Sequence, residues 1–150
     1  MTVAICSDHG GFELKEKLIP YLEELGFEME DFGCFSSDSV DYPDYAFPMA
    51  EAVARGEYER GIAICGTGIG VSMCCNKVDG VRCALCGDVV SAELTRRHND
   101  SNVLAMGARI IGVETAKAIA KAWLTTGFEG GRHSGRIAKI SAYEETRIKD

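Results

Sequence analysis

Short apolar runs along this chain alternate with longer segments in which apolar residues recur every three or four positions. Runs of four to six residues are typical of β-strands, and they occur at residues 3–6, 27–32, 62–65, 81–86 and 102–106. The longer periodic segments predict helices at residues 14–25, 44–55, 71–77, 88–97, 113–126 and 136–148. Strands that helices separate are typical of a parallel sheet covered on both faces.

This alternation predicts a single-domain α/β fold, a doubly wound Rossmann-like sandwich with a five-stranded parallel sheet and helices on both faces. Ligands of such folds bind outside the carboxyl ends of the strands. One local conflict lies in the first helix, where Pro20 interrupts an apolar stripe that Gly26 ends. We expect Pro20 to kink or shorten that helix.

Composition agrees with one globular domain over residues 1–150, because 46% of the chain is hydrophobic and 26% is charged. The longest apolar runs are too short to span a bilayer, and the N-terminus has neither a basic region nor a cleavage signature. We therefore expect a cytoplasmic protein without a membrane partner. The net charge of −7 argues against nucleic-acid binding.

The charge is nevertheless uneven. Residues 1–60 carry 4 basic and 14 acidic side chains, whereas residues 61–150 carry 12 basic and 9 acidic ones. Most of these charges are expected on solvated helix faces. A small anionic substrate needs only two or three convergent arginines, so an acidic protein can still bind a phosphate group.

Seven cysteines form an odd set without the spacing of a disulfide framework, and we expect reduced thiols. Cys83 and Cys86 have the spacing of a metal or redox pair. They lie on a predicted strand, however, where residues three apart point to opposite faces. No second pair completes a metal-binding set, so we expect no metal and interpret most of the cysteines as small core residues.

The loop Cys65-Gly-Thr-Gly-Ile-Gly70 follows a predicted strand and opens a predicted helix. It matches neither the dinucleotide fingerprint nor the P-loop. One interpretation is a plain tight turn. The density of glycine favours another, a cradle for an anion or oxyanion built from the N–H groups of Gly66, Gly68, Ile69 and Gly70, beside the Thr67 hydroxyl. Cys65, the first residue of the loop, would lie beside this cradle as a base or nucleophile.

Further candidates lie in loops near the first two strands. Asp8 and His9 directly follow the first strand, and two glycines after them would let a ligand approach the backbone. Asp8 could instead, or in addition, cap the first helix. Tyr42 lies in the loop after the second strand and is either a substrate contact or a packed aromatic residue.

The second half of the chain offers a histidine and several arginines. His98 and Asn99 follow a predicted helix, where a histidine serves either as a C-terminal cap or in catalysis. Arg109 follows the fifth strand, and Arg132 and Arg136 lie one helical turn apart, a spacing that favours a phosphate between them. We expect these groups on the carboxyl side of the sheet, with the glycine loop.

Two acid–base groups with a phosphate grip suit proton transfer next to the carbonyl of a phosphorylated substrate. A base removes a carbon-bound proton, backbone N–H groups stabilise the enediolate, and the proton returns to the neighbouring carbon. This is an aldose–ketose isomerisation, which needs no cofactor.

Several motifs together resemble the type B ribose-5-phosphate isomerases, within a wider family of galactose-6-phosphate and allose-6-phosphate isomerases. The motifs span roughly residues 2–145: Ser7-Asp-His-Gly-Gly11, Asp41-Tyr-Pro43, Cys65-Gly-Thr-Gly-Ile-Gly70, Asn76-Lys77, Arg96-Arg-His-Asn99, Asn102-Val-Leu-Ala105, Gly107-Ala-Arg109 and Glu129-Gly-Gly-Arg-His133.

The resemblance implies that Cys65 shuttles the proton between C1 and C2, as in the thiol-using branch, and that His98, together with Asp8, opens the furanose ring. It implies an enediolate cradle at residues 66–70 with Thr67 nearby, and sugar contacts from Asn99 and Tyr42. The phosphate grip would consist of His9, Arg109, Arg132 and Arg136. It further implies a homodimer, paired into tetramers in some members, whose active sites draw residues from both subunits.

Two alternatives remain open. The same chemistry could act on a six-carbon substrate, allose or galactose 6-phosphate, because the room between Cys65 and the arginines cannot be obtained from the sequence. The fold could also serve a noncatalytic module that binds sugar phosphates or nucleotides. Such a binder would have no need for both a thiol at a strand end and His98.

Overall fold

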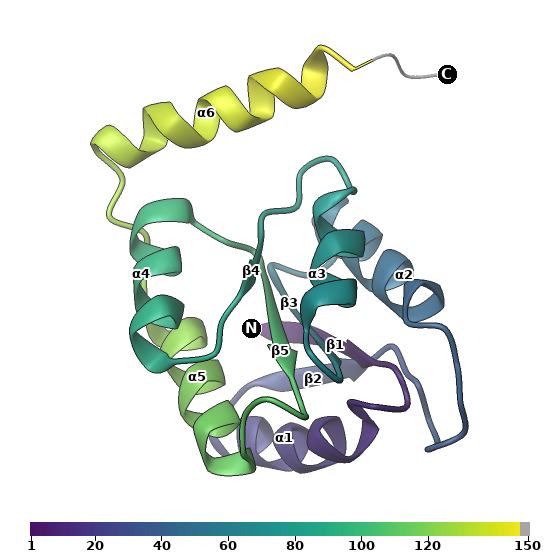
Figure 1. The fold of residues 1–150 in the computed structure, drawn as a ribbon. Coiled ribbons are helices and arrows are strands. Elements are labelled where there is room, and N and C mark those ends of the chain that lie inside the picture. The colour runs from purple at the N-terminus through teal and green to yellow at the C-terminus, as the bar shows by residue number, and fades with distance from the viewer. Residues whose placement is uncertain (148–150) are drawn as a thin grey trace.

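The computed structural model describes residues 1–147, and its centre is a five-stranded parallel sheet with the strand order β2-β1-β3-β5-β4 (Figure 1). The strands are β1 (Thr2–Ser7), β2 (Glu28–Asp31), β3 (Arg60–Cys65), β4 (Cys83–Leu85) and β5 (Val103–Gly107). The helices are α1 (Phe12–Glu24), α2 (Pro43–Ala54), α3 (Ile69–Asn76), α4 (Val89–Asn99), α5 (Val113–Thr125) and α6 (Arg132–Glu145). The predicted Rossmann-like sandwich is confirmed.

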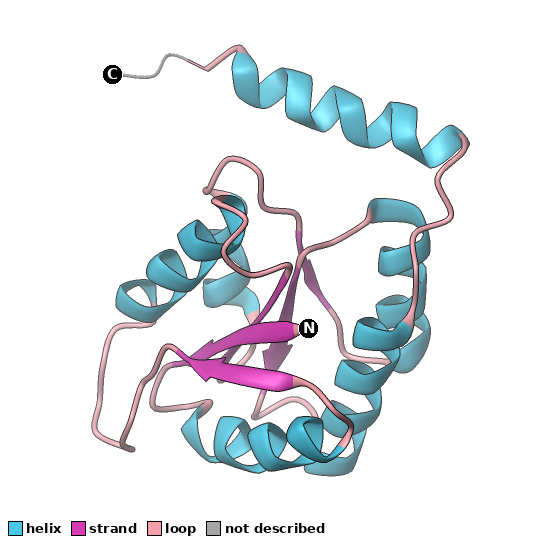
Figure 2. Ribbon diagram, turned by 180° about the vertical axis from the view of Figure 1, so that it is seen from behind, coloured by secondary structure: helices cyan, strands magenta, loops and turns pink. Residues whose placement is uncertain are grey.

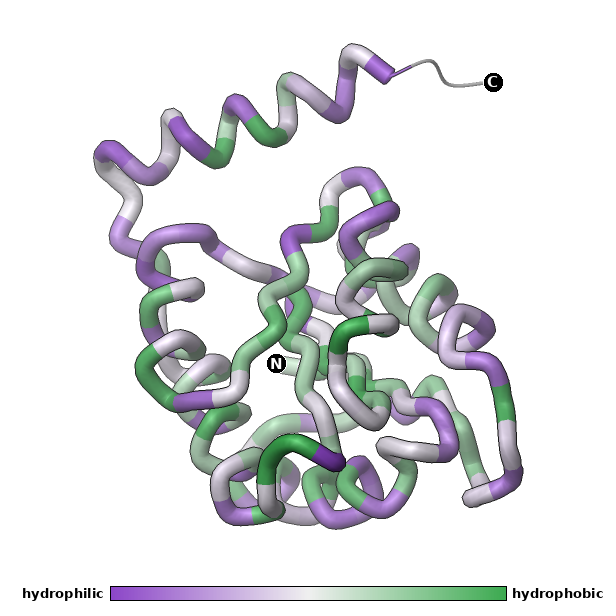
Figure 3. Tube along the Cα trace, viewed as in Figure 1, coloured by the Kyte–Doolittle hydropathy of each residue, from purple (hydrophilic) through white to green (hydrophobic). Residues whose placement is uncertain are grey.

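The helices cover both faces of the sheet, with α2 and α3 on one side and α1, α4 and α5 on the other (Figure 2). Alternate strand residues point to opposite faces. Ile62 and Ile64 of β3 therefore join the core under α1 and α5, whereas Ala63 and Cys65 join the core under α2 and α3. Figure 3 shows apolar strands at the centre and hydrophilic residues on the outer helices.

Several element boundaries differ from those predicted. The strand expected at 81–86 is shorter, and the helix expected to begin at residue 136 begins at Arg132, so part of the expected glycine-rich loop is helical. The expected end of that helix, residue 148, lies outside the described residues. Helix α1 continues through Pro20 without being shortened, because Pro20 and Glu16 are both exposed and water can satisfy the Glu16 carbonyl that loses its partner.

Helix α6 lies apart from the α/β body, at the edge from which β4 and β5 begin (Figure 1). A groove of about 750 Å³ separates it from that edge and is lined by residues of both, among them Arg82, Asn99, Ile140 and Tyr143. His133 is the only buried residue of α6. Among the described helices, none combines the length and the apolar character that crossing a membrane would require.

Candidate active site

The site forms where the chain changes direction in the sheet. From β1 the chain first adds β2 on one side and then β3 on the other, so the carboxyl ends of β1 and β3 flank a crevice. Gly11 allows the two ends to meet, because a Cβ there would lie 2.6 Å from the Ile64 carbonyl oxygen. The turn that holds Asp8 and His9 consequently lies against the loop that begins at Cys65.

Cys65 ends β3, and its side chain is only 5% exposed. The N–H of Gly68 donates a hydrogen bond of 3.2 Å to its Sγ, which stabilises negative charge on the sulfur. Gly68 adopts φ +78° and has no room for a side chain, since a Cβ would lie 2.5 Å from Leu85 Cδ1. Only glycine can therefore turn the loop so that this N–H points at the thiol.

The rest of the loop presents unused donors at the start of α3. The Thr67 hydroxyl accepts the N–H of Ile69 at 3.2 Å. Within residues 1–147, the N–H groups of Gly66, Thr67 and Gly70 have no hydrogen-bond acceptor. Unpaired N–H groups at a helix N-terminus attract an anion or a developing oxyanion. The loop thus has the form of the predicted cradle, with sulfur beside it.

Several of the other thiols lie in surroundings that raise their pKa. Burial raises the pKa of Cys74, and burial together with Asp88 raises the pKa of Cys86 to about 11. A hydrogen bond with Cys75 is the largest cause that raises the pKa of Cys83, and burial is the next. These environments favour the neutral thiol, which agrees with a packing role. All seven cysteines are free, and Cys83 is the only one that is not fully buried.

The residues around the cradle include Asp8, His9 and Tyr42, as the sequence predicts. Asp8 Oδ1 accepts the N–H of Gly11 at 3.1 Å, so Asp8 also holds the turn that precedes α1. His9 Nδ1 accepts the N–H of Val40 at 3.1 Å, which leaves its Nε2 as the donor available to a ligand. A cavity of about 390 Å³ is lined by Asp8, His9, Tyr42 and their neighbours.

The side chains of Tyr42 and Arg109 both pack against the glycine loop. The Tyr42 ring packs against Gly70, where a Cβ would lie 2.7 Å from its Cζ. Arg109 comes from the end of β5, and its side chain covers Gly66, where a Cβ would lie 3.3 Å from Arg109 Cδ. The structure therefore brings an arginine, a tyrosine and an Asp–His pair together around the Cys65 loop.

His98, Asn99, Arg132 and Arg136 do not lie there, so the expectation of one shared edge within the chain is wrong. Helix α4 leaves the carboxyl end of β4 and returns to the opposite edge, where β5 begins. His98 is near the C-terminal end of α4, and α6 begins beside it. The two edges are about 20 Å apart, the length of a six-residue strand.

At this second edge the His98 ring stacks on His133, with centroids 4.4 Å apart and planes inclined by 17°. Burial and the nearby charges of His98 and Arg132 lower the pKa of His133. Sequence reasoning did not select His133 as a candidate, although it stands in the quoted motif that ends at that residue. Its segment was interpreted as a loop, whereas α6 already includes it.

His98, His133 and Glu129 are also the described residues that could hold a metal ion. One ligand atom from each lies within 4.8 Å of the others. The two imidazoles are stacked nearly parallel, and the positive charges of Arg132 and Arg136 act on His133, which disfavours a cation. The same arrangement, rich in positive charge and N–H donors, suits an anionic ligand.

The sequence analysis also missed an apolar surface beside the cradle. Ile69, Leu85 and Ile110 are 47%, 44% and 67% exposed, and they border a pocket of about 270 Å³ that Thr67 also lines. Ile140 and Tyr143 of α6 are comparably exposed at the other edge. Individual exposed residues of this kind are common, but a group beside a polar site is typical of a surface that another chain covers.

Comparisons with known proteins agree with this geometry. A profile of the family described as Ribose/Galactose Isomerase matches residues 3–140. YwlF of Bacillus subtilis is 58% identical over 99% of this chain and 100% of its own length. Ribose-5-phosphate isomerase B of Escherichia coli is 49% identical over 97% of each chain. The structure of ribose-5-phosphate isomerase B from Clostridium thermocellum has a TM-score of 0.95 and 47% identity, over 97% of this chain and 98% of the other.

Proposed function

Because the chain belongs to the ribose/galactose isomerase family, we propose that it interconverts ribose 5-phosphate and ribulose 5-phosphate. The observation that carries the proposal is the position of Cys65. Its sulfur accepts the Gly68 N–H at the head of a loop that has further unused donors. A base directly beside an oxyanion cradle is the arrangement that enediolate chemistry requires.

The reaction begins with the closed sugar. His98, with Asp8, moves a proton between the ring oxygen and the anomeric hydroxyl, and the furanose opens to the free aldehyde. Cys65 then takes the proton from C2, and the electron pair left behind forms the C1–C2 double bond of an enediolate. The N–H groups of residues 66–70 stabilise its oxygen, with the Thr67 hydroxyl nearby. The proton of the C2 hydroxyl moves to O1, and return of the carbon-bound proton to C1 gives the ketose.

The phosphate group needs cations and donors at the far end of the sugar. His9 offers Nε2–H in the cavity beside Tyr42, and Arg109 lies against Gly66 of the cradle. Arg132 and Arg136 provide two more guanidinium groups at the opposite edge, one turn apart on α6. Asn99 adds a polar contact with the substrate at that edge.

The distance between the two edges supports an active site that two copies of the chain share. Cys65 and His98 are separated by about the length of a strand, which no side chain can bridge. In a homodimer, the α4–α6 edge of one protomer faces the Cys65 loop of its partner, and the exposed Ile69, Leu85 and Ile110 are covered. Each dimer then has two complete active sites, and dimers can pair further into tetramers.

The cellular setting follows from the same proposal. Residues 1–150 form one sugar-phosphate isomerase domain that acts in the cytoplasm, where a reducing environment keeps the free cysteines reduced. Its partners are the small phosphorylated sugar and a second copy of itself. The chemistry outlined above uses side chains and backbone groups alone.

A coupled assay with purified protein and no added metal tests the function. We expect turnover of ribose 5-phosphate, and Cys65→Ala should lower it by at least about 100-fold, the typical contribution of a general base. Allose 6-phosphate and galactose 6-phosphate should be assayed in parallel. A higher kcat/KM for either six-carbon substrate would shift the assignment within the family. No turnover of any of the three would favour a noncatalytic binding module.

A further inference from the structure

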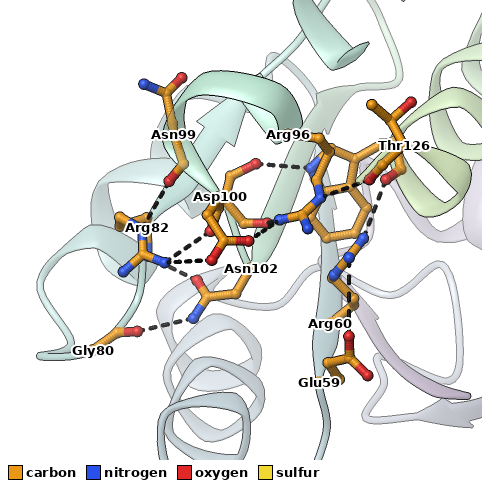
Figure 4. A network of polar contacts seen from close by, with 11 residues as sticks. Glu59, Arg60, Gly80, Arg82, Arg96, Asn99, Asp100, Asn102 and Thr126 are labelled. Atoms are coloured by element: carbon orange, nitrogen blue, oxygen red, sulfur yellow. Dashed lines mark hydrogen bonds and ion pairs between the residues drawn. The ribbon is translucent and has the colours of Figure 1, made fainter. Parts of the chain in front are cut away.

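The C-terminal end of α4 is held by a network of arginines and one aspartate (Figure 4). Arg82 lies just before β4 and reaches across to this end. Its Nε–H donates to the Asn99 carbonyl oxygen at 2.9 Å, and its Nη2–H donates to the Asp100 carbonyl oxygen at 2.8 Å. Carbonyl groups at a helix end lack partners within the helix, so Arg82 fixes the backbone of the residues beside His98.

Asp100 completes the helix end in an unusual conformation. It is the one non-glycine residue with positive φ among residues 1–147, at φ 44° and ψ 46°. Its carboxylate accepts a hydrogen bond of 2.8 Å from Arg96 and forms an ion pair of 3.6 Å with Arg82. Two guanidinium groups therefore hold the residue in a region that favours glycine or asparagine.

The same network reaches the segment that leads into α6. Arg96 is 4% exposed, and besides Asp100 it donates to the carbonyl oxygens of Ser101 and Thr126. Three residues beyond Thr126, the N–H of Glu129 donates to the Arg97 carbonyl oxygen at 3.1 Å. The backbone before Arg132 and His133 is thus tied to the backbone that carries His98.

We propose that Arg82 and Asp100 are positioning residues, which set the place of the His98 ring and the Asn99 side chain for the reaction. This inference rests on the proposed function, in which His98 opens the sugar ring. Neither residue needs to touch the substrate. They act through the backbone of residues 98–100, and a displacement of about 1 Å in a catalytic group can cost about 100-fold in rate.

Stability alone does not account for the network at Arg82. The side chains of Arg82 and Asp100 are 22% and 40% exposed, and ion pairs this close to solvent contribute little to folding. Arg96, by contrast, is buried, and its removal would disturb the core. Arg82 is therefore the residue at which positioning and folding can be separated most cleanly by experiment, because Asp100 is also the partner of the buried Arg96.

The kinetic test compares Arg82→Ala and Asp100→Asn with wild-type protein. Asparagine keeps the size of aspartate and tolerates positive φ, so Asp100→Asn removes only the charge. Arg55→Ala is the control, because Arg55 forms a comparable ion pair with Glu57 on the exposed end of α2. We expect kcat with ribose 5-phosphate to fall about 10- to 100-fold in both Arg82→Ala and Asp100→Asn, with KM changed less than about 3-fold.

A double-mutant cycle shows whether the loss passes through His98. In the background of His98→Gln, Arg82→Ala should lower kcat by less than about 2-fold, because the group that it positions is already absent. Losses that multiply would overturn the proposal, as would wild-type kcat in both Arg82→Ala and Asp100→Asn. Thermal unfolding should place Arg82→Ala with Arg55→Ala, whereas Asp100→Asn also weakens the ion pair of the buried Arg96 and should unfold at a lower temperature.

An NMR measurement separates the failure of this inference from the failure of the proposed function. The chain has only three histidines, so the ring Cε1–H signals are resolvable. Arg82→Ala should shift the His98 and His133 signals more than that of His9, which lies at the opposite edge of the same chain. If His98→Gln kept full turnover, the proposed role of His98 would be wrong, and the spectra would still test whether Arg82 positions the His98 ring. Unmoved His98 and His133 signals in Arg82→Ala would refute that positioning role.

Discussion

Protomers with complementary defects should restore activity to each other. Cys65→Ala disables the carboxyl edge of a protomer, and His98→Gln disables its α4–α6 edge. Each homodimer then lacks an essential group in both active sites. In a mixed dimer, one site combines both defects, whereas the other combines the intact Cys65 loop of one protomer with the intact His98 edge of its partner.

The expected size of the effect follows from this pairing. A purified mixed dimer has one complete site of two, so it should reach about one half of the wild-type kcat. A site contained within one chain would instead leave both sites of the mixed dimer defective. The separation of Cys65 and His98 by about the length of a strand predicts the first outcome.

The assay requires two different affinity tags on co-expressed chains and purification over both resins. Activity with ribose 5-phosphate is then compared with that of each tagged homodimer. A doubly tagged preparation in which both chains carry Cys65→Ala controls for contamination by host isomerase. A mixed dimer no more active than the two defective homodimers would refute the shared site.

Three further predictions concern packing and ionisation. Gly70→Ala should raise KM about 3- to 10-fold, because a Cβ would lie 2.7 Å from the Tyr42 Cζ and displace the ring; an unchanged KM would remove Tyr42 from the substrate contacts. Asp31→Ala should lower the free energy of unfolding by about 3 kcal/mol in urea titrations, since it leaves the fully buried Lys15 ammonium without its partner at 2.7 Å; a loss below about 1 kcal/mol would contradict this. Alkylation of Cys86 at pH 8 should be slow and accelerate only as pH approaches 11, because its raised pKa keeps the thiol protonated; mass spectrometry that found rapid modification at pH 8 would contradict this.

The sheet and the Cys65 edge could be predicted from the sequence because both follow from local rules. Apolar runs separated by helices imply a parallel sheet, and the residues after β1 and β3 must then meet at its carboxyl edge. Asp8, His9 and the glycine loop were placed correctly for this reason. Arg109 joined them because β5 pairs with β3.

The predicted place of His98 and the predicted start of α6 were wrong for different reasons. His98 lies near the end of a helix that follows a strand, and such a helix returns to the amino edge of the sheet. The topology alone therefore gives the place of His98. The first turn of α6 contains Ser134 and Gly135, which are poor helix formers. Burial of His133 against His98 outweighs this local preference, and such a tertiary contact is not visible in the sequence.

Removal of the carbon-bound proton by Cys65 is the central claim, and ribulose 5-phosphate in D2O tests it most directly. This ketose cannot close a furanose ring, since its C5 oxygen carries the phosphate, so loss of its C1 hydrogen reports proton transfer without the ring-opening step. The rate is followed by proton NMR as deuterium exchange plus aldose formation. We predict that Cys65→Ala lowers it by at least about 100-fold while His98→Gln changes it far less. Proton loss at the wild-type rate in Cys65→Ala would contradict the account.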